Sequence, residues 1–173
     1  MENIKRAKED SDNIYLQCRK EKGYTRAEAC ELMDFVSQSR LEKVENEKSP
    51  VRPEEVAAMA KAYGKPELCN YYCTHECPIG QKYVPQLEIN DLAHLALQLI
   101  SSINSFEKTK DRLIEIAADG QISEEELPDF AKVEEGAEQL SVAVESLSLW
   151  ISSMIESGMI NKERFEAIKK TIK

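Results

Sequence analysis

Three of the five cysteines of this 173-residue chain lie in one short segment, LCNYYCTHECPIG, residues 68–80. Cys69, Cys73 and Cys77 are spaced four residues apart, and His75 lies between the last two. Thiolates and imidazoles are the side chains that bind zinc and iron–sulfur clusters, so these four residues could hold Zn or Fe–S. Zinc knuckles, however, take a closely spaced pair of ligands and complete the set with a second, distant pair. That second pair is missing from this sequence.

Helix geometry argues further against a metal at this segment. On a straight helix, cysteines at i, i+4 and i+8 are spread over about 12 Å, given a rise of ~1.5 Å per residue. A single tetrahedral ion with Zn–S distances of ~2.3 Å cannot collect all three. Pro78 to Gly80 could bend only the end that holds Cys77. We therefore expect the cysteines to pack as small hydrophobic side chains with Leu68 and Tyr72, without a cofactor. A metal- or thiol-responsive site is the alternative.

The composition predicts a soluble, mostly helical protein. Glycine and proline number six each, and 42% hydrophobic with 32% charged residues suits such a fold. No apolar run approaches the ~20 residues needed to span a bilayer. The N-terminus MENIKRAKED lacks the apolar core of a signal peptide, and five cysteines, an odd number, argue for reduced thiols. We therefore expect a cytoplasmic protein with no membrane partner.

Charge is distributed unevenly along the chain. Residues 1–68 hold 13 Lys and Arg against 14 Asp and Glu, a net charge of −1. Residues 69–173 hold 10 against 18, a net charge of −8. An acidic second half is a poor general binder of nucleic acid, so any such contact must come from the first half. The chain has two histidines, no glycine-rich phosphate loop and no nucleophile–base set, so we do not expect an enzyme.

The first half consists of short amphipathic segments separated by turn signals. NIYLQCRKEKG ends at a glycine, and TRAEACELMD opens with a T-x-x-E capping box of Thr25 and Glu28. Ser37 can cap SQSRLEKVEN, in which only Leu41 and Val44 are apolar, so one narrow stripe faces inward. PEEVAAMAKAYG begins with a proline in its first turn and ends at Gly64. The pattern predicts short helices over residues 13–64.

The order of these segments resembles the helix-turn-helix domain of the phage-repressor/Cro-like (Xre) family of transcriptional regulators. The resemblance runs from about residue 13 to residue 72 and is carried by RKEKGYTRAEACELM, VSQSRLEKVEN and PEEVAAMAKAYG. It implies a five-helix, repressor-like DNA-binding domain. The sequence departs from the family in two places. One extra residue lies near Asp34 and Phe35, and the glycine that usually follows the third helix is absent from VENEKSP.

The resemblance also implies roles for individual residues. The helix from Ser37 would enter the major groove of duplex DNA with Ser37, Gln38, Ser39 and Arg40 toward base edges and Lys43 one turn further on. In that position Gln38 would read adenine and Arg40 guanine. Phosphates would be held by Thr25 and Arg26 at the start of the second helix and by Asn46 and Lys48 in the loop after the third. Arg19 and Glu45 match a structural pair that ties the first helix to the third.

The second half has two long apolar stripes on either side of an Asp-Gly turn. Apolar residues step by three and four over residues 89–117 and again over residues 130–154. The first stripe is Ile89, Leu92, Ala96, Leu99, Ile103, Phe106, Lys110, Leu113 and Ala117, with Lys110 as its one polar member; the second is Phe130, Val133, Ala137, Leu140, Val144, Leu147, Ile151 and Met154. Two such stripes predict an antiparallel helical hairpin, followed by a short helix capped by Asn161.

The hairpin carries more apolar surface than two helices can enclose. The simplest solution is a homodimer in which two hairpins form a four-helix bundle; folding back on the first domain is the alternative. We thus expect an all-α protein with DNA-binding domain 1–72, a cysteine-containing linker 73–86 and a dimerisation domain 87–173. The predicted function is sequence-specific regulation of transcription as a homodimer. The alternatives are a metal- or thiol-responsive regulator, and a helical scaffold that does not bind DNA.

Overall fold

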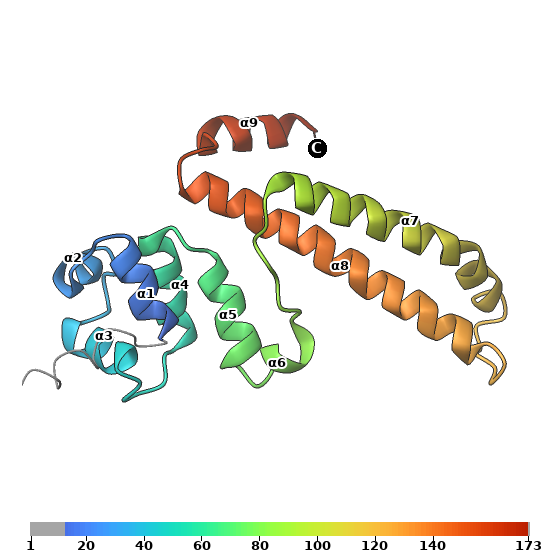
Figure 1. The fold of residues 1–173 in the computed structure, drawn as a ribbon, viewed down its shortest axis with the longest axis horizontal. Helices are drawn as coiled ribbons and strands as arrows, with labels where there is room; N and C mark the ends of the chain where they lie inside the picture. The colour runs from blue at the N-terminus through green and yellow to red at the C-terminus, as the bar shows by residue number, and fades with distance from the viewer. Residues whose placement is uncertain (1–12, 173) are drawn as a thin grey trace, which may run out of the picture. The chain divides into compact units, whose positions relative to one another are not determined.

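The computed structural model describes residues 13–172, and every regular element among them is a helix (Figure 1). The predicted all-α fold is confirmed, including the N-terminal group of short helices, the long hairpin and the short C-terminal helix. None of the helices described is long and apolar enough to cross a membrane. The elements are α1 (Ile14–Glu21), α2 (Arg26–Glu31), α3 (Gln38–Glu45), α4 (Pro53–Tyr63), α5 (Glu67–His75), α6 (Gly80–Tyr83), α7 (Leu92–Ile116), α8 (Leu127–Glu156) and α9 (Lys162–Ile172).

The short helices begin and end where the sequence predicts. Thr25 and Glu28 form the expected capping box, in which each side chain accepts a hydrogen bond from the backbone N–H of the other residue. Ser37 caps α3 by accepting from the N–H of Arg40 at 3.2 Å. Gly64 ends α4 at φ +57°, a left-handed conformation that suits glycine. Local sequence therefore determines the limits of these helices.

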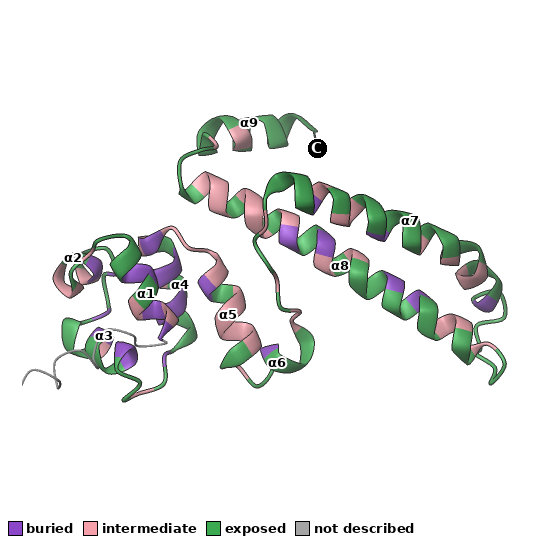
Figure 2. Ribbon diagram, in the orientation of Figure 1, coloured by how far each residue is buried: buried purple, intermediate pink, exposed green. Residues whose placement is uncertain are grey.

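The first five helices enclose one hydrophobic core, whose buried residues are the purple segments of these helices in Figure 2. Its fully buried large side chains come from the turn after α2 and from α3, α4 and α5, and they include Met33, Leu41, Met59, Tyr63 and Leu68. Two polar ties join α1 to α3. The Nη2 of Arg19 donates to Oε2 of the buried Glu45 at 2.9 Å, and the Nδ2 of Asn13 donates to the carbonyl of Val44 at 3.1 Å. The predicted Arg19–Glu45 pair is confirmed.

In the loop after α3, a glutamate occupies the backbone position that a glycine usually takes. Glu47 adopts φ +56°, the only positive φ of a non-glycine residue in residues 13–172. Its N–H donates to the carbonyl of Val44, and the N–H of Lys48 donates to that of Lys43. These two bonds form the Schellman motif that normally places glycine at this position. The glutamate therefore occupies a strained conformation where the missing glycine would lie.

A tight corner joins α5 to α6. A Cβ added to Gly80 would lie 2.2 Å from the carbonyl oxygen of Cys73, so any side chain would collide with the backbone of α5. The N–H of Gly80 also lies 3.4 Å from Sγ of Cys77, and Nε2 of Gln81 donates to the carbonyl of His75. The chain bends at residues 78–80, where the sequence allows it to, and the close approach of the two backbones requires glycine.

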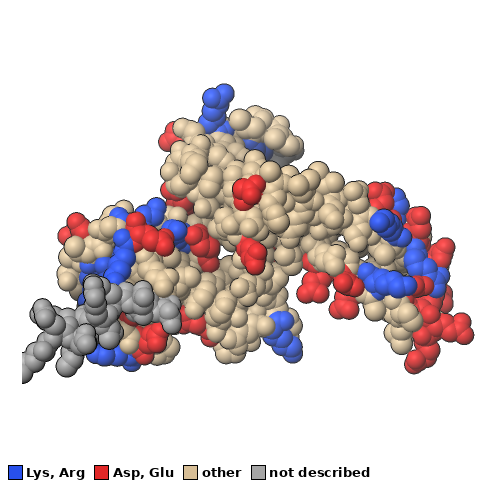
Figure 3. Space-filling view, viewed as in Figure 1, with Lys and Arg blue, Asp and Glu red and all other residues tan. Residues whose placement is uncertain are grey.

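Helices α7 and α8 form an antiparallel pair. Nε of Arg112 on α7 lies 3.0 Å from Oδ2 of Asp129 on α8, and further along the pair Gly136 faces Phe106. Residue 112 thus lies opposite residue 129 and residue 106 opposite residue 136, the order expected for antiparallel helices. Charged side chains of both signs gather over the tip of the hairpin (Figure 3). The turn contains Gly120 at φ +70°, as the Asp-Gly signal predicts.

The seam of the hairpin differs from the predicted stripes. The buried residues are Leu95, Ser102 and Ile116 on α7, and Val133, Gly136, Ala143 and Ser146 on α8. Predicted members Leu92, Ile103 and Val144 are exposed, and Ile89 precedes the helix because Asp91 caps it. Small residues bring the two helices close, and the contact face is turned by about one residue from the most hydrophobic face. The most hydrophobic face therefore remains partly open.

Contacts divide the chain after residue 84 and again after residue 152, so that the hairpin from 85 to 152 is one compact unit. The residues on either side of it group into the other unit. The last helix, α9, begins at the predicted cap, where Oδ1 of Asn161 accepts from the N–H of Arg164 at 2.8 Å.

Candidate nucleic-acid interface

The first turn of α3 presents polar side chains to solvent. Ser37, Gln38 and Ser39 are exposed, and so is Lys43 one turn later. The opposite face of the helix buries Leu41, Val44 and Glu45. A helix anchored along one stripe with its N-terminal side chains free is the arrangement by which repressor helices read base edges. Gln38, Ser39 and Lys43 can therefore reach a partner without disturbing the core.

Arg40 lies on the flank of α3 and is held inside the domain. Its Nε and Nη2 donate to the two carboxylate oxygens of Glu55, each at 2.7 Å. Its Nη1 donates to Oγ of Ser49 at 2.6 Å, and Nη2 also donates to the carbonyl of Pro50 at 2.7 Å. The guanidinium thus joins α3 to the following loop and to α4. All three guanidinium nitrogens of Arg40 thus have acceptors within the domain, while the resemblance implies that this side chain reads a base edge.

At the start of α2, Thr25 is exposed and Arg26 is half-buried. Nε of Arg26 lies 2.7 Å from Oε2 of Glu45, the same carboxylate that receives Arg19. Two guanidinium groups therefore share one buried acid. Because the group is bound through Nε, Arg26 keeps its position at the surface while still presenting positive charge beside the first turn of α2.

In the loop after α3, the side chains of Asn46, Glu47 and Lys48 are all exposed. The predicted phosphate-binding residues Asn46 and Lys48 thus flank an acidic residue. The negative charge of Glu47 offsets the positive charge of Lys48, so the three residues together carry no net charge. Glu47 would also repel a phosphate.

Comparison with known protein families matches the N-terminal part of the chain. Residues 16–68 match the family model described as helix-turn-helix. This stretch covers most of α1, all of α2 to α4 and the beginning of α5, with most of the buried core described above. The N-terminal part of this chain is a helix-turn-helix domain. The match supports a DNA-binding transcription regulator, because this domain is a DNA-binding regulatory module and not a catalytic one. No curated protein and no solved structure matches the chain.

Two residues of the helix-turn-helix domain belong to this surface although the sequence alone did not single them out. Arg52 precedes α4 and lines a surface pocket with Phe35, Ser37 and Arg40. A basic residue directly before the proline that opens a helix was the available signal. Glu55, which binds Arg40 and accepts from the N–H of Arg52 at 2.9 Å, had no such signal, because its partner lies 15 residues away.

The cysteine segment follows the helix-turn-helix domain, and its packing is only partly as expected. Leu68 is fully buried, and Tyr72 packs against the core. Cys69, however, is exposed, and Cys73 and Cys77 are half-buried. The expectation of a packed cysteine stripe is therefore wrong for Cys69. The face of α5 that carries Leu68 points inward, and the next residue is turned by about 100° around the helix.

The predicted metal ligands Cys69, Cys73, His75 and Cys77 are not brought together as a set. Within residues 13–172 no group of three or more His, Cys, Asp or Glu side chains is arranged to hold a metal ion. The ring of His75 stacks on Tyr71, with centroids 4.3 Å apart. Desolvation raises the pKa of the Cys69 thiol, and the neighbouring Cys73 raises it further, so the reactive thiolate is disfavoured.

Proposed function

We propose that this protein is a sequence-specific transcription regulator that binds duplex DNA as a homodimer. The observation that carries the proposal is the exposed first turn of α3 within a stretch that matches the helix-turn-helix family. Gln38 would read a base edge through its paired donor and acceptor, with Ser39 and Lys43 beside it. Because Arg40 is bound by Glu55, it would fix the angle of α3 and leave base reading to its neighbours.

Phosphate contacts in this proposal come from the start of α2 and from the loop after α3, the helix that would read the bases. Thr25 and Arg26 would hold one stretch of backbone, and Asn46 and Lys48 another. Exposed Glu42 and Glu47 lie close to the same surface, so each domain would neutralise few phosphates. Affinity rises with the number of phosphates neutralised, so two domains on one site would bind where a single domain would bind weakly. A regulator of this kind would work in the cytoplasm with the DNA.

The hairpin supplies the support for dimerisation. Within residues 85–152 the buried hydrophobic side chains are Leu95, Ile116, Val133 and Ala143. Two helices of 25 and 30 residues cannot be held by a core of this size alone. The exposed hydrophobic side chains of the same unit are Leu92, Leu97, Ile100, Ile103, Ile114, Ile122, Leu127 and Val144, together with Ile89 before the helix. A second hairpin would cover such a surface.

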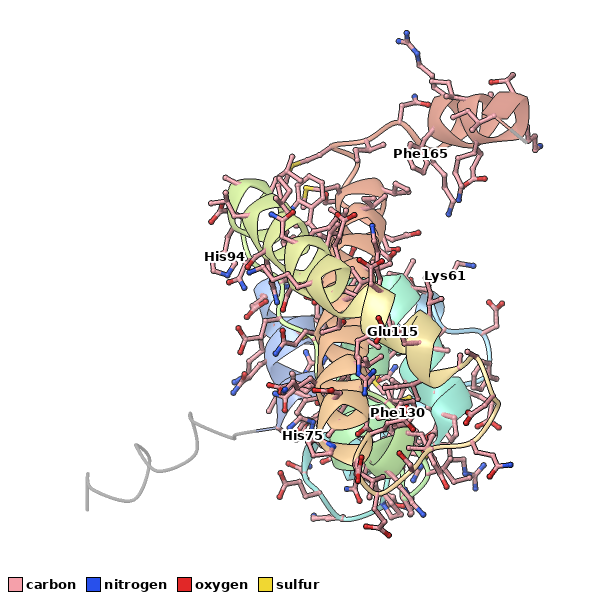
Figure 4. All side chains as sticks on the ribbon, turned by 90° about the vertical axis from the view of Figure 1, so that its right-hand side faces the viewer. Lys61, His75, His94, Glu115, Phe130 and Phe165 are labelled. Carbon is pink, nitrogen blue, oxygen red and sulfur yellow. The ribbon has the colours of Figure 1, made fainter. Side chains whose placement is uncertain are left out.

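One groove of the hairpin is suited to receive that second copy. It lies between α7 and α8, has a volume of about 840 Å³ and is lined by Leu97 and Val142 among polar side chains. His94, which lies at the surface of α7 (Figure 4), and Glu138 stand on opposite walls. Across a two-fold axis each such patch meets its own copy, so a partly apolar groove with both kinds of polar group can be self-complementary.

Selection of bound fragments from a random library of duplex DNA tests the function. We expect enriched sequences with two-fold symmetry, since a symmetric dimer reads two half-sites. No enrichment would support a helical scaffold that does not bind DNA.

The reading helix is tested on the enriched sequence. Gln38→Ala should weaken binding by about 1–3 kcal/mol and relax the preference at one base position. Lys48→Ala should weaken all sequences to a similar degree, because a phosphate contact carries no sequence information. Fluorescence anisotropy at several salt concentrations measures both effects. Equal loss of sequence preference in the two variants would contradict base reading by Gln38.

A further inference from the structure

A second pocket lies on the helix-turn-helix domain, away from the first turn of α3. It has a volume of about 420 Å³ and is formed by the start of α1, the end of α3 with its following loop, and the end of α5. Its residues include Tyr15, Glu47, Ser49, Tyr71 and Glu76. This volume suits a small molecule of a few heavy atoms. Three segments far apart in the sequence therefore meet around a space of ligand size.

The charged side chains that line this pocket are acidic. Glu47 and Glu76 contribute carboxylates, and no Lys or Arg is among the pocket residues of the described chain. One oxygen of Glu76 accepts from the hydroxyl of the buried Tyr15 at 2.6 Å. Within residues 13–172 no ion pair reaches either carboxylate. A cation is thus the ligand whose charge would be complementary to the site.

Aromatic side chains form part of the wall, beside the aliphatic Ile14, Val44 and Val51. Tyr71 stacks on His75 and meets Tyr15 edge to face, with ring centroids 6.2 Å apart. His75 itself lies at the surface (Figure 4). Desolvation raises the pKa of Tyr71, and the charges of Glu76 and Glu47 raise it further, which places both acids within electrostatic reach of the same phenol. Acids beside aromatic rings favour an organic cation over a bare metal ion.

We propose that this pocket binds a small alkyl amine between Glu47 and Glu76, and that binding strengthens the interaction with DNA. The second part rests on the proposed function. Glu47 lies between Asn46 and Lys48 in the loop expected to face phosphates. A bound ammonium group would neutralise this acid and so reduce its repulsion of the DNA backbone. By thermodynamic linkage, DNA would increase the affinity for the amine by the same factor.

Binding is tested first without DNA, on the full chain, by isothermal titration calorimetry with 1,4-diaminobutane at constant ionic strength. We expect saturable binding, and none with 1,4-butanediol, which has the same length but no charge. Glu76→Gln keeps an acceptor for Tyr15 and removes the charge, so it should weaken binding about tenfold, the scale of one charge-assisted hydrogen bond. Glu47→Gln should do the same. Glu31→Gln, an exposed acid outside the pocket, should bind as the unaltered protein does.

Two results would overturn the pocket assignment. One is a lack of saturable binding by the unaltered protein, and the other is equal binding by the two Gln variants and the Glu31→Gln control. Circular dichroism melting of each variant establishes that it is folded before the comparison.

The link to DNA is measured separately, by anisotropy on the selected site with and without the diamine. We expect about a fivefold gain in affinity, at the lower end of typical allosteric couplings. Glu76→Gln should bind DNA but lose the gain, which separates the pocket from direct effects of the diamine on DNA. Unchanged DNA affinity with a bound diamine would overturn the coupling alone. Absence of any DNA binding would instead contradict the proposed function and leave the calorimetric result standing.

Discussion

The guanidinium of Arg40 illustrates how a residue's partners decide its role. In the sequence it is a basic residue near the start of a polar helix, three residues after the Ser37 cap, where an exposed side chain is expected. In the structure it makes a two-pronged pair with Glu55, whose side chain is 8% exposed, and it also holds the loop through Ser49. Replacing this arginine should therefore affect the stability of the domain directly, whatever its effect on DNA recognition.

Arg40→Ala should lower the free energy of unfolding by about 2 kcal/mol, because it leaves the largely buried Glu55 without its charged partner. Gln38→Ala, at an exposed position on the same turn, should change it by less than about 0.5 kcal/mol. Urea unfolding followed by circular dichroism measures both. The double variant Arg40→Ala with Glu55→Ala should recover part of the loss. Equal stability of the two single variants would rule out the structural role of Arg40.

The same pair makes stability depend on pH. Its hydrogen bonds with Arg40 hold the pKa of Glu55 below the ordinary value for a glutamate. A lowered folded-state pKa contributes stability above the unfolded-state pKa and loses it as pH falls through the folded-state value. The difference between the unaltered protein and Arg40→Ala should thus be constant above roughly pH 5 and shrink below it. A difference that grew on acidification would contradict this assignment.

Glu47 offers a second test at single-residue scale. Its left-handed backbone costs a side-chain-bearing residue roughly 1 kcal/mol, a cost that glycine does not bear. We expect Glu47→Gly to raise the free energy of unfolding by about that amount. Glu47→Ala removes the same carboxylate but keeps the strained backbone, so it separates the effect of charge from that of conformation. Equal stabilisation by both changes would mean that charge is the cause.

At the scale of elements, the corner between α5 and α6 depends on one close contact. Gly80→Ala should move α6 off α5, because its Cβ would meet the backbone of Cys73, which cannot rotate away. We expect a loss of about 1–3 kcal/mol and faster amide exchange through α6. Gly136→Ala is the matched control, since its Cβ would meet the Phe106 ring at an ordinary 3.6 Å. Unaltered exchange in the Gly80 variant would show that the corner is looser than described.

At the scale of the whole molecule, the proposed homodimer depends on the open face of the hairpin. Leu97→Glu places a charge on a side chain that is 68% exposed in the single chain, so the hairpin itself should tolerate it. In the dimer the same charge would be buried without a partner, and we expect monomers with unchanged helix content. Light scattering after size-exclusion chromatography measures the mass. Met159→Glu, at an exposed apolar position outside the hairpin, should remain dimeric. A monomeric unaltered protein at micromolar concentration would exclude the dimer.

The sequence by itself determined the helices, because their signals are local. The Thr25–Glu28 capping box, the Ser37 and Asn161 caps and the Gly64 stop each act within a few residues, and the structure has each of them in place. The order of these segments was also sufficient to predict the helix-turn-helix domain that the family comparison finds.

Only the tertiary structure decided which side chains form hydrogen bonds or ion pairs with residues far away in the sequence. Glu55 holds Arg40 from 15 residues away, and Glu76 holds Tyr15 from 61. The hairpin seam contains Ser102, Gly136 and Ala143 and not the predicted stripes, because close packing of two backbones favours small residues over the most hydrophobic face. Hydrophobic periodicity records which residues avoid water, but it does not record which neighbour covers them. That neighbour is set by how the helices approach one another in space.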